Sequence, residues 1–212
     1  MIAVLVVAMG NFCLQSTSLE AAQVVGLAIN DKEGIYQLAL EVILNARSDD
    51  VHHVITDYAH IYRIDPSIVE SGIMGKPGAS VTRVRTVIND CVLLLCRPIL
   101  RVEDVRETGH DDIDSVVVPQ LSNIRSGSEH WQIHPIGNKT RINYKSTLEP
   151  GFFVPPLVGS TVVEKKIRDE TLLCFNNIER IARIRGEQVR AHNATTSDTH
   201  AKHTGSKHDE AN

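Results

Sequence analysis

The stretch LEPGFFVPPLVGSTVVEKKIRDETLLCFNNIERIARI, from Leu148 to Ile184, decides the fold. It opens with the end of a strand and passes through Pro150, Pro155 and Pro156 before a helical pattern begins. Proline fixes the backbone φ angle and donates no backbone hydrogen bond. The segment therefore predicts a stiff corner, which ends a sheet near Leu148 and directs the next helix back across that sheet.

The helix after the corner is predicted from apolar side chains at helical spacing. They form one stripe, opposite a charged face, and comprise Val158, Val162, Ile167, Cys174, Ile178 and Ile181. Gly186 is a typical residue just past the end of a helix, so the helix is predicted to stop there.

The chain before the corner predicts an antiparallel meander. Apolar or alternating segments cover residues 34–46, 66–75, 79–90, 91–108, 113–124, 129–136 and 139–150. Short turns at 76–78, 109–112, 125–128 and 137–138 separate the later ones. Because a parallel crossover needs a dozen or more residues, these strands are expected to pair antiparallel.

One further helix is predicted between the first two strands. It runs from an N-cap at Ser48 to the stop at Asp65-Pro66, with apolar residues on one face. His53, Asp57 and His60 share the opposite face, where they are either metal ligands or part of a solvated helix face.

The N-terminus carries an apolar run from Ile2 to Met9, too short to span a bilayer as a helix. Residues 1–18 fit a secretory signal with Ser16 and Ser18 at the cleavage site, and the alternative is a buried first strand. Export, to a periplasm in a bacterial source, is predicted, with no membrane span in the mature chain. No Lys or Arg precedes the run, so a cytoplasmic location stays open.

Composition excludes one class of partner. The net charge of −4 and the aromatic content of 4% argue against a surface for nucleic acid, so no nucleic-acid partner is predicted. The polar residues 187–212 predict a disordered tail, with weak transition-metal binding by its four histidines as the alternative. Cys91 and Cys96 are placed on one strand and, like Cys174, are predicted to be buried free thiols.

The segment SEHWQIHPIGNKTRINYKSTLEPGFFVPPLVGSTVVEKKIRDETLLCFNNIERIA resembles the C-terminal half of the START-like (SRPBCC) helix-grip superfamily. That superfamily includes polyketide cyclase/dehydrase-like and coenzyme-Q-binding-like lipid-transport domains. The matching features are a strand with Trp131, a turn followed by Thr140-Arg141, a closing strand and the three prolines. NARSDDVHHVITDYAHIYRIDPSIVES resembles the early helix pair of the superfamily.

The resemblance covers roughly residues 34–185 and implies an α+β helix-grip domain over residues 30–186. Such a domain has a curved antiparallel sheet of about six or seven strands wrapped around a long C-terminal helix. It also has a short helix pair after the first strand. A hydrophobic small molecule is the expected partner, held between the sheet and the last helix.

The candidate ligand-binding residues are polar or aromatic side chains expected near that space: Arg83, Arg85, Arg101, Glu103, Trp131, Tyr144, Phe152 and Phe153. An arginine inside a cavity holds a carboxylate, phosphate or quinone oxygen. The alternatives are an outer solvated face for the arginines, ordinary core packing for Trp131 and Tyr144, and a plug at the helix entry for the phenylalanines.

Three functions follow from this reading. The first is binding or transport of a lipid, quinone or polyketide-like molecule without catalysis, and no catalytic residue, metal or cofactor is predicted for it. The second is a cyclase-, dehydratase- or hydrolase-type enzyme, with Glu103 and His134 as acid–base candidates. The third is a structural or interaction module of the cell envelope, marked by an exposed apolar patch.

Overall fold

The computed structural model describes residues 21–92, 95–151 and 159–205, without the side chains of residues 90–97, 159–160 and 197–205. The predicted signal at 1–18, Cys13, Phe152 and Phe153 lie outside the described residues. The elements, in chain order, are β1 (Gln23–Lys32), β2 (Ile35–Leu44), α1 (Ser48–Ile55), the 3₁₀ turn η1 (Ile61–Arg63), β3 (Ile68–Gly78), β4 (Val81–Val92), β5 (Leu95–Thr108), β6 (Asp112–Val117), the 3₁₀ turn η2 (Pro119–Leu121), β7 (Ile124–Ile136), β8 (Lys139–Pro150) and α2 (Gly159–Gly205).

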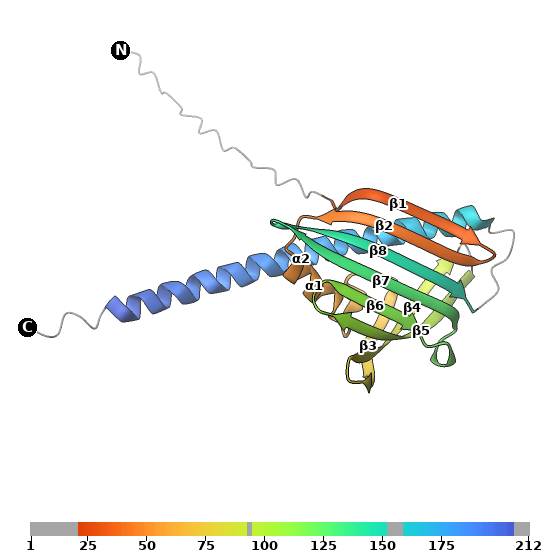
Figure 1. The fold of residues 1–212 in the computed structure, drawn as a ribbon, viewed down its shortest axis with the longest axis horizontal. Coiled ribbons are helices and arrows are strands. Elements are labelled where there is room, and N and C mark those ends of the chain that lie inside the picture. The colour runs from red at the N-terminus through yellow and green to blue at the C-terminus, as the bar shows by residue number, and fades with distance from the viewer. Residues whose placement is uncertain (1–20, 93–94, 152–158, 206–212) are drawn as a thin grey trace, which may run out of the picture.

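The strands form one eight-stranded antiparallel sheet in the order β1-β2-β8-β7-β6-β5-β4-β3, and α2 runs along one face of it (Figure 1). This confirms the predicted α+β helix-grip layout. The strand that the prediction missed is β1, a hairpin partner of β2 through the turn Glu33-Gly34, both with positive φ. The predicted signal covers residues 1–18 and the predicted domain begins at residue 30, so most of β1 falls in the stretch between them that had no assignment.

The face of the sheet toward α2 is here called the inner face. Alternation along the strands buries every second residue on this face, as in β2, where Leu38, Leu40, Val42 and Leu44 are buried. Phe175, Ile178 and Ala182 of α2 join the same core. Each fully buried large apolar side chain stabilises the fold by about 1.5–3 kcal/mol, so this face supplies the main driving force.

The first helix is shorter than predicted. Its N-cap is Arg47 rather than Ser48, and α1 ends at Ile55, where the Thr56 hydroxyl donates to the carbonyl oxygen of His52 at 2.8 Å. Asp57 and His60 therefore lie beyond the helix, where they pair at 2.7 Å, and they share no helix face with His53. In the described part of the chain no three side chains gather as metal ligands.

The last helix is longer than predicted, and its end at Gly186 is wrong. It spans 47 residues to Gly205 and projects past the sheet (Figure 1). A Cβ at Gly186 would stand 2.5 Å from Asp50 Oδ2, so this glycine allows α1 and α2 to approach closely instead of ending the helix. No helix of the described residues has an apolar stretch long enough to cross a membrane.

Four strand boundaries differ from expectation. The strand predicted over residues 113–124 ends at Val117, and η2 follows it. Residues 91–108 are not one strand, because the chain reverses and Cys91 is the register partner of Cys96 across β4 and β5. Residues 125–128 lie within β7, and residues 76–78 within β3, so the two predicted turns there are wrong. The predicted hairpin turn Gly137-Asn138 is confirmed between β7 and β8, with Gly137 at φ 60°.

Candidate functional site

The inner face divides into two halves that differ in packing. The closed half contains side chains with no exposed surface: Val42, Leu44, Ile133, Thr140 and Ile142, covered by Val51 of α1 and Ile178 and Ala182 of α2. The accessible half is defined by Arg101 and Glu103 of β5, Ser115 of β6, Glu129 and Trp131 of β7, Tyr144 of β8 and Phe175 of α2. Arg101 and Glu129 keep 21% and 17% of their side-chain surface exposed, whereas Glu103, Ser115 and Phe175 are buried, so solvent contacts part of this half.

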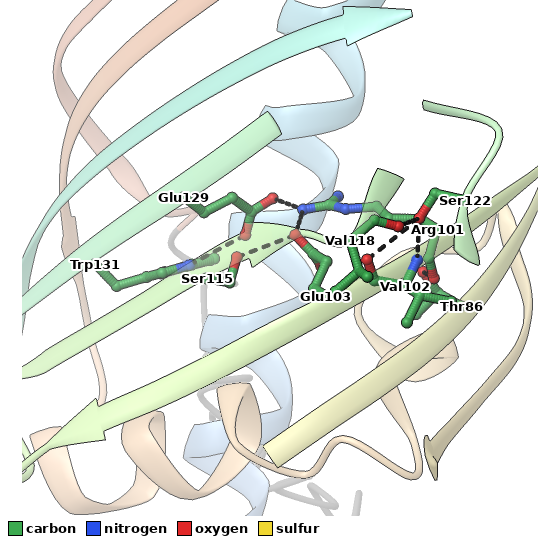
Figure 2. A network of polar contacts seen from close by, with 9 residues as sticks. All are labelled: Thr86, Arg101, Val102, Glu103, Ser115, Val118, Ser122, Glu129 and Trp131. Carbon is green, nitrogen blue, oxygen red and sulfur yellow. Dashed lines mark hydrogen bonds and ion pairs between the residues drawn. The ribbon is translucent and has the colours of Figure 1, made fainter. Parts of the chain in front are cut away.

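A polar cluster occupies the accessible half (Figure 2). Arg101 Nη2 donates to Glu103 Oε1 at 2.6 Å and also to Glu129 Oε1. The Ser115 hydroxyl donates to Glu103 Oε1 at 3.0 Å, and Trp131 Nε1 donates to Glu129 Oε2 at 3.3 Å. One arginine nitrogen thus joins two carboxyl groups, each of which has a second donor.

Hydrogen bonds from β4 and from the residues that flank η2 hold the backbone of the cluster in place. The backbone N–H of Val102 donates to the Ser122 hydroxyl at 2.9 Å, and that hydroxyl donates to the carbonyl oxygen of Val118 at 2.9 Å. The Thr86 hydroxyl donates to the carbonyl oxygen of Arg101 at 3.4 Å (Figure 2). These bonds fix the backbone that carries Arg101 and Glu103, so the cluster stands on a rigid strand.

Aromatic rings form the apolar side of the same half. The ring centroid of Trp131 lies 4.3 Å from that of Tyr144 and 5.4 Å from that of Phe175, and Tyr144 and Phe175 are 5.6 Å apart. These separations are typical of attractive ring contacts. The aromatic wall, contributed by both the sheet and α2, meets the polar cluster at Glu129.

The three charged groups differ in their pKa shifts. Burial raises the pKa of Glu103, and Glu129 adds to this while Arg101 opposes it. Burial also disfavours ionised Glu129, but Arg101 and the donors around it outweigh burial, so the pKa of Glu129 is lowered. For Arg101, burial is outweighed by the two carboxyl groups and the pKa is raised. The two carboxyl groups are therefore shifted in opposite directions, and Glu103 is the easier of the two to protonate.

Four of the predicted site residues are brought together here: Arg101, Glu103, Trp131 and Tyr144. Arg83 lies on the opposite face, where its Nε donates to Asp104 at 2.7 Å, and Arg85 on that face pairs with Glu70. His134 alternates with the fully buried Ile133 and is exposed on the outer side. Cys174 packs against the core, as predicted, and burial raises the pKa of its thiol.

Sequence reasoning missed Glu129, Ser115 and Phe175. Glu129 stands two residues before Trp131, so the predicted strand over 129–136 already places both side chains on one face. The local sequence does not show that Arg101 of β5 lies beside Glu129 on that face. A hollow of about 270 Å³ lies over β6–β8 and shares Ser115 and Glu129 with the cluster. Its other lining residues are Asp114, Val116, Ser128, His130, Lys145, Ser146 and Thr147.

Comparisons with known proteins bear on the fold. No protein-family model matches the chain, and no curated protein sequence does. Solved structures do match. The Zhui aromatase/cyclase from Streptomyces sp. R1128 aligns with a TM-score of 0.59 at 13% identity, over 71% of this chain and 95% of that one.

Two further structures are similar. The STAR-related lipid transfer protein from Xanthomonas axonopodis aligns with a TM-score of 0.54 at 17% identity, over 72% of this chain and 98% of that one. A START superfamily protein from Mycobacterium smegmatis aligns with a TM-score of 0.53 at 12% identity, over 68% of this chain and 98% of that one. The sheet order, the long last helix and these alignments together show that the chain has the START-like helix-grip fold.

Proposed function

We propose that the protein binds a hydrophobic small molecule against the accessible half, between the sheet and α2. The observation that carries the proposal is an aromatic wall beside a buttressed polar cluster that is still partly exposed on the inner face. An apolar body packs on Trp131, Tyr144 and Phe175, and a polar atom of the ligand meets Arg101 and Glu103. Apolar linings with a few placed polar groups are typical of small-molecule sites.

The similar solved structures also support a hydrophobic ligand. Proteins with this fold include one titled a lipid transfer protein and one titled an aromatase/cyclase. Both titles concern apolar or aromatic molecules, although identity below 20% limits the comparison to the fold. The closed half has no comparable combination, since it is filled with apolar side chains.

Trp131 provides a direct test, because it is the single tryptophan of the chain and belongs to the site. Protein purified from its own host is analysed by native mass spectrometry and solvent extraction, and the stripped protein is titrated with apolar ligands while Trp131 fluorescence is followed. A retained apolar molecule and saturable fluorescence changes are expected. The proposal would be refuted if the purified protein retained no apolar molecule and no apolar ligand gave a saturable fluorescence change.

Catalysis is the second candidate, and Glu103 is the observation that favours it. Its carboxyl group lies on the inner face beside Arg101, and burial raises its pKa, which is the direction that a proton donor requires. His134 faces away and supplies no partner. Incubation of the extracted ligand with wild type and with Glu103→Gln tests this candidate. A product formed only by the wild type, with ligand binding retained by the variant, would support it.

A further inference from the structure

The polar cluster of the accessible half has an unusual charge balance. Arg101 is its one cation, and its Nη2 already bonds both Glu103 and Glu129. The net charge is therefore −1 when both carboxyl groups are ionised and zero when Glu103 is protonated. In neither state does the cluster have positive charge left for a ligand.

The surroundings do not correct this balance. Beyond the cluster's own members, the largest charge effects on it and on its neighbours Tyr144 and Cys174 come from Tyr144, Cys174 and Asp65, none of which is a cation. Arg83 and Arg85 lie on the opposite face with carboxylates of their own. Lys166 of α2 pairs with Glu170 at 2.5 Å.

An anionic ligand would therefore lose its hydration and meet a neutral or negative cluster. Burial of an ion without a compensating partner is strongly unfavourable. A neutral oxygen needs no compensating charge. Arg101 Nε, buried without a hydrogen-bond partner in the described part of the chain, is an unused donor that such an oxygen reaches only by displacing the side chains that cover it. A protonated Glu103 donates to a carbonyl, and a ligand hydroxyl also donates to the Glu129 carboxylate.

We infer that the site selects neutral apolar ligands that carry a carbonyl or hydroxyl oxygen, and discriminates against the matching carboxylates and phosphates. The inference rests on the proposed function, since it names the class of ligand for the same site. It also reverses the ordinary expectation for an arginine in a cavity, which is to hold an anion.

The test compares three twelve-carbon probes: dodecanol, methyl dodecanoate and dodecanoate. They are titrated at about pH 8, where a carboxylic acid is ionised, with Trp131 fluorescence as the readout. The alcohol or the ester is expected to bind at least about tenfold more tightly than the carboxylate, as a buried unpaired charge requires. Dodecanoate should gain affinity as the pH falls and it becomes neutral.

The double variant Glu103→Gln/Glu129→Gln leaves Arg101 unneutralised and should reverse the preference in favour of dodecanoate. Glu70→Gln is the matched control, because it removes a carboxylate from Arg85 on the opposite face. That control should keep the wild-type preference.

The outcomes separate the two claims. Wild-type protein that binds dodecanoate as tightly as the neutral probes would overturn the inference and leave the proposed function standing. Wild-type protein that binds none of the probes, and yields no apolar molecule on extraction, would overturn the proposed function itself. If the double variant does not fold, the wild-type comparison and its pH dependence still decide the inference.

Discussion

The closed and accessible halves of the inner face share strands but differ in what they bury. β7 contributes Ile133 to the closed half and Glu129 to the accessible half, and β8 contributes Ile142 and Tyr144 in the same way. The closed half is covered by α1 and by the part of α2 that carries Ile178 and Ala182, and it contains side chains without exposed surface. The accessible half contains a charged cluster whose Arg101 and Glu129 side chains are partly exposed to solvent.

The difference indicates that one part of each strand stabilises the fold and another part serves binding. Apolar burial in the closed half is favourable without any partner group. Burial of Arg101 with two carboxyl groups is at best weakly favourable, because desolvation offsets the attraction. A protein selected only for stability has no need of the cluster, so its presence next to the aromatic wall favours a role in binding.

The largest effect is expected from Arg101→Met. It leaves Glu103 and Glu129 buried without their shared cation, and removal of one partner of a buried pair costs about 3–5 kcal/mol. Urea denaturation followed by circular dichroism near neutral pH measures the loss. The loss should shrink as the pH is lowered and the carboxyl groups become neutral.

Arg83→Met is the matched control for this experiment. Arg83 also has two hydrogen bonds to a carboxylate, that of Asp104, but on the outer solvated face. A partly exposed pair contributes about 0–1 kcal/mol. Equal losses of stability in Arg101→Met and Arg83→Met would show that the buried ion pairs of the inner face do not matter more than the partly exposed pair of the outer face.

The closed half is tested by Ile142→Ala, with a slightly smaller expected effect. Ile142 has no exposed surface and lies between Val42 and Ile133 in register. Truncation at such a site costs about 2–5 kcal/mol, measured by the same denaturation. Ile73→Ala, at a position 55% exposed on β3, should change stability by less than about 0.5 kcal/mol. A loss below that size for Ile142→Ala would contradict dense packing of the closed half.

The sequence predicted the closed half better than the accessible one. Alternation along β8 placed Ile142 and Tyr144 on one face, and Ile178 of the predicted α2 stripe is fully buried, although Val162 of the same stripe is 39% exposed. Arg101 and Glu103 were placed correctly on one face, but Arg83 and Arg85 have the same alternation and lie outside. Local pattern shows which residues share a face and leaves open which face meets α2.

The missed features depend on tertiary contacts. Gly186 has the local features of a helix end, but its role comes from Asp50, far away in the chain. Glu129 resembles a solvated strand residue until Arg101 is placed beside it. The reversal between Cys91 and Cys96 lacks the Asn-Gly or Asp-Gly signal of a two-residue turn, so the run was read as one strand.

A moderate effect is expected from Gly151→Ala, which perturbs the strand end next to the accessible half. A Cβ at Gly151 would stand 2.3 Å from the carbonyl oxygen of Asn123, and that backbone atom cannot swing away. Overpacking of this kind costs about 1–3 kcal/mol. Asn123 also accepts from the backbone N–H of Leu100, next to Arg101, so ligand affinity should fall together with stability.

Gly72→Ala is the control for that variant, because nothing lies within 4 Å of a Cβ at Gly72. It should leave affinity unchanged in the fluorescence titration. Unchanged stability in Gly151→Ala would mean that the β8 end can move away from Asn123, so the accessible half would be less rigid than its hydrogen bonds indicate.

The smallest expected effect is a pH dependence of stability that arises from His52 of α1, the helix that covers the closed half. Burial lowers the pKa of His52, His110 adds to this with its ring centroid 4.6 Å away, and Glu107 opposes it. A histidine whose pKa is lower in the folded state binds fewer protons there than in the unfolded chain. Its stabilisation is therefore present above the unfolded pKa of about 6.5 and is lost as the pH falls below that value.

Wild-type protein should accordingly become less stable from about pH 7 to pH 5, by less than about 1 kcal/mol for this group. His52→Gln should flatten that part of the curve, since glutamine does not titrate there. His60→Gln is the control, because His60 lies outside the helix, 41% exposed, and already pairs with Asp57. If the free energy of unfolding of the wild type changed with pH as little as that of His52→Gln, protonation of His52 would not destabilise the packing of α1. Acid would then not weaken the closed half through α1.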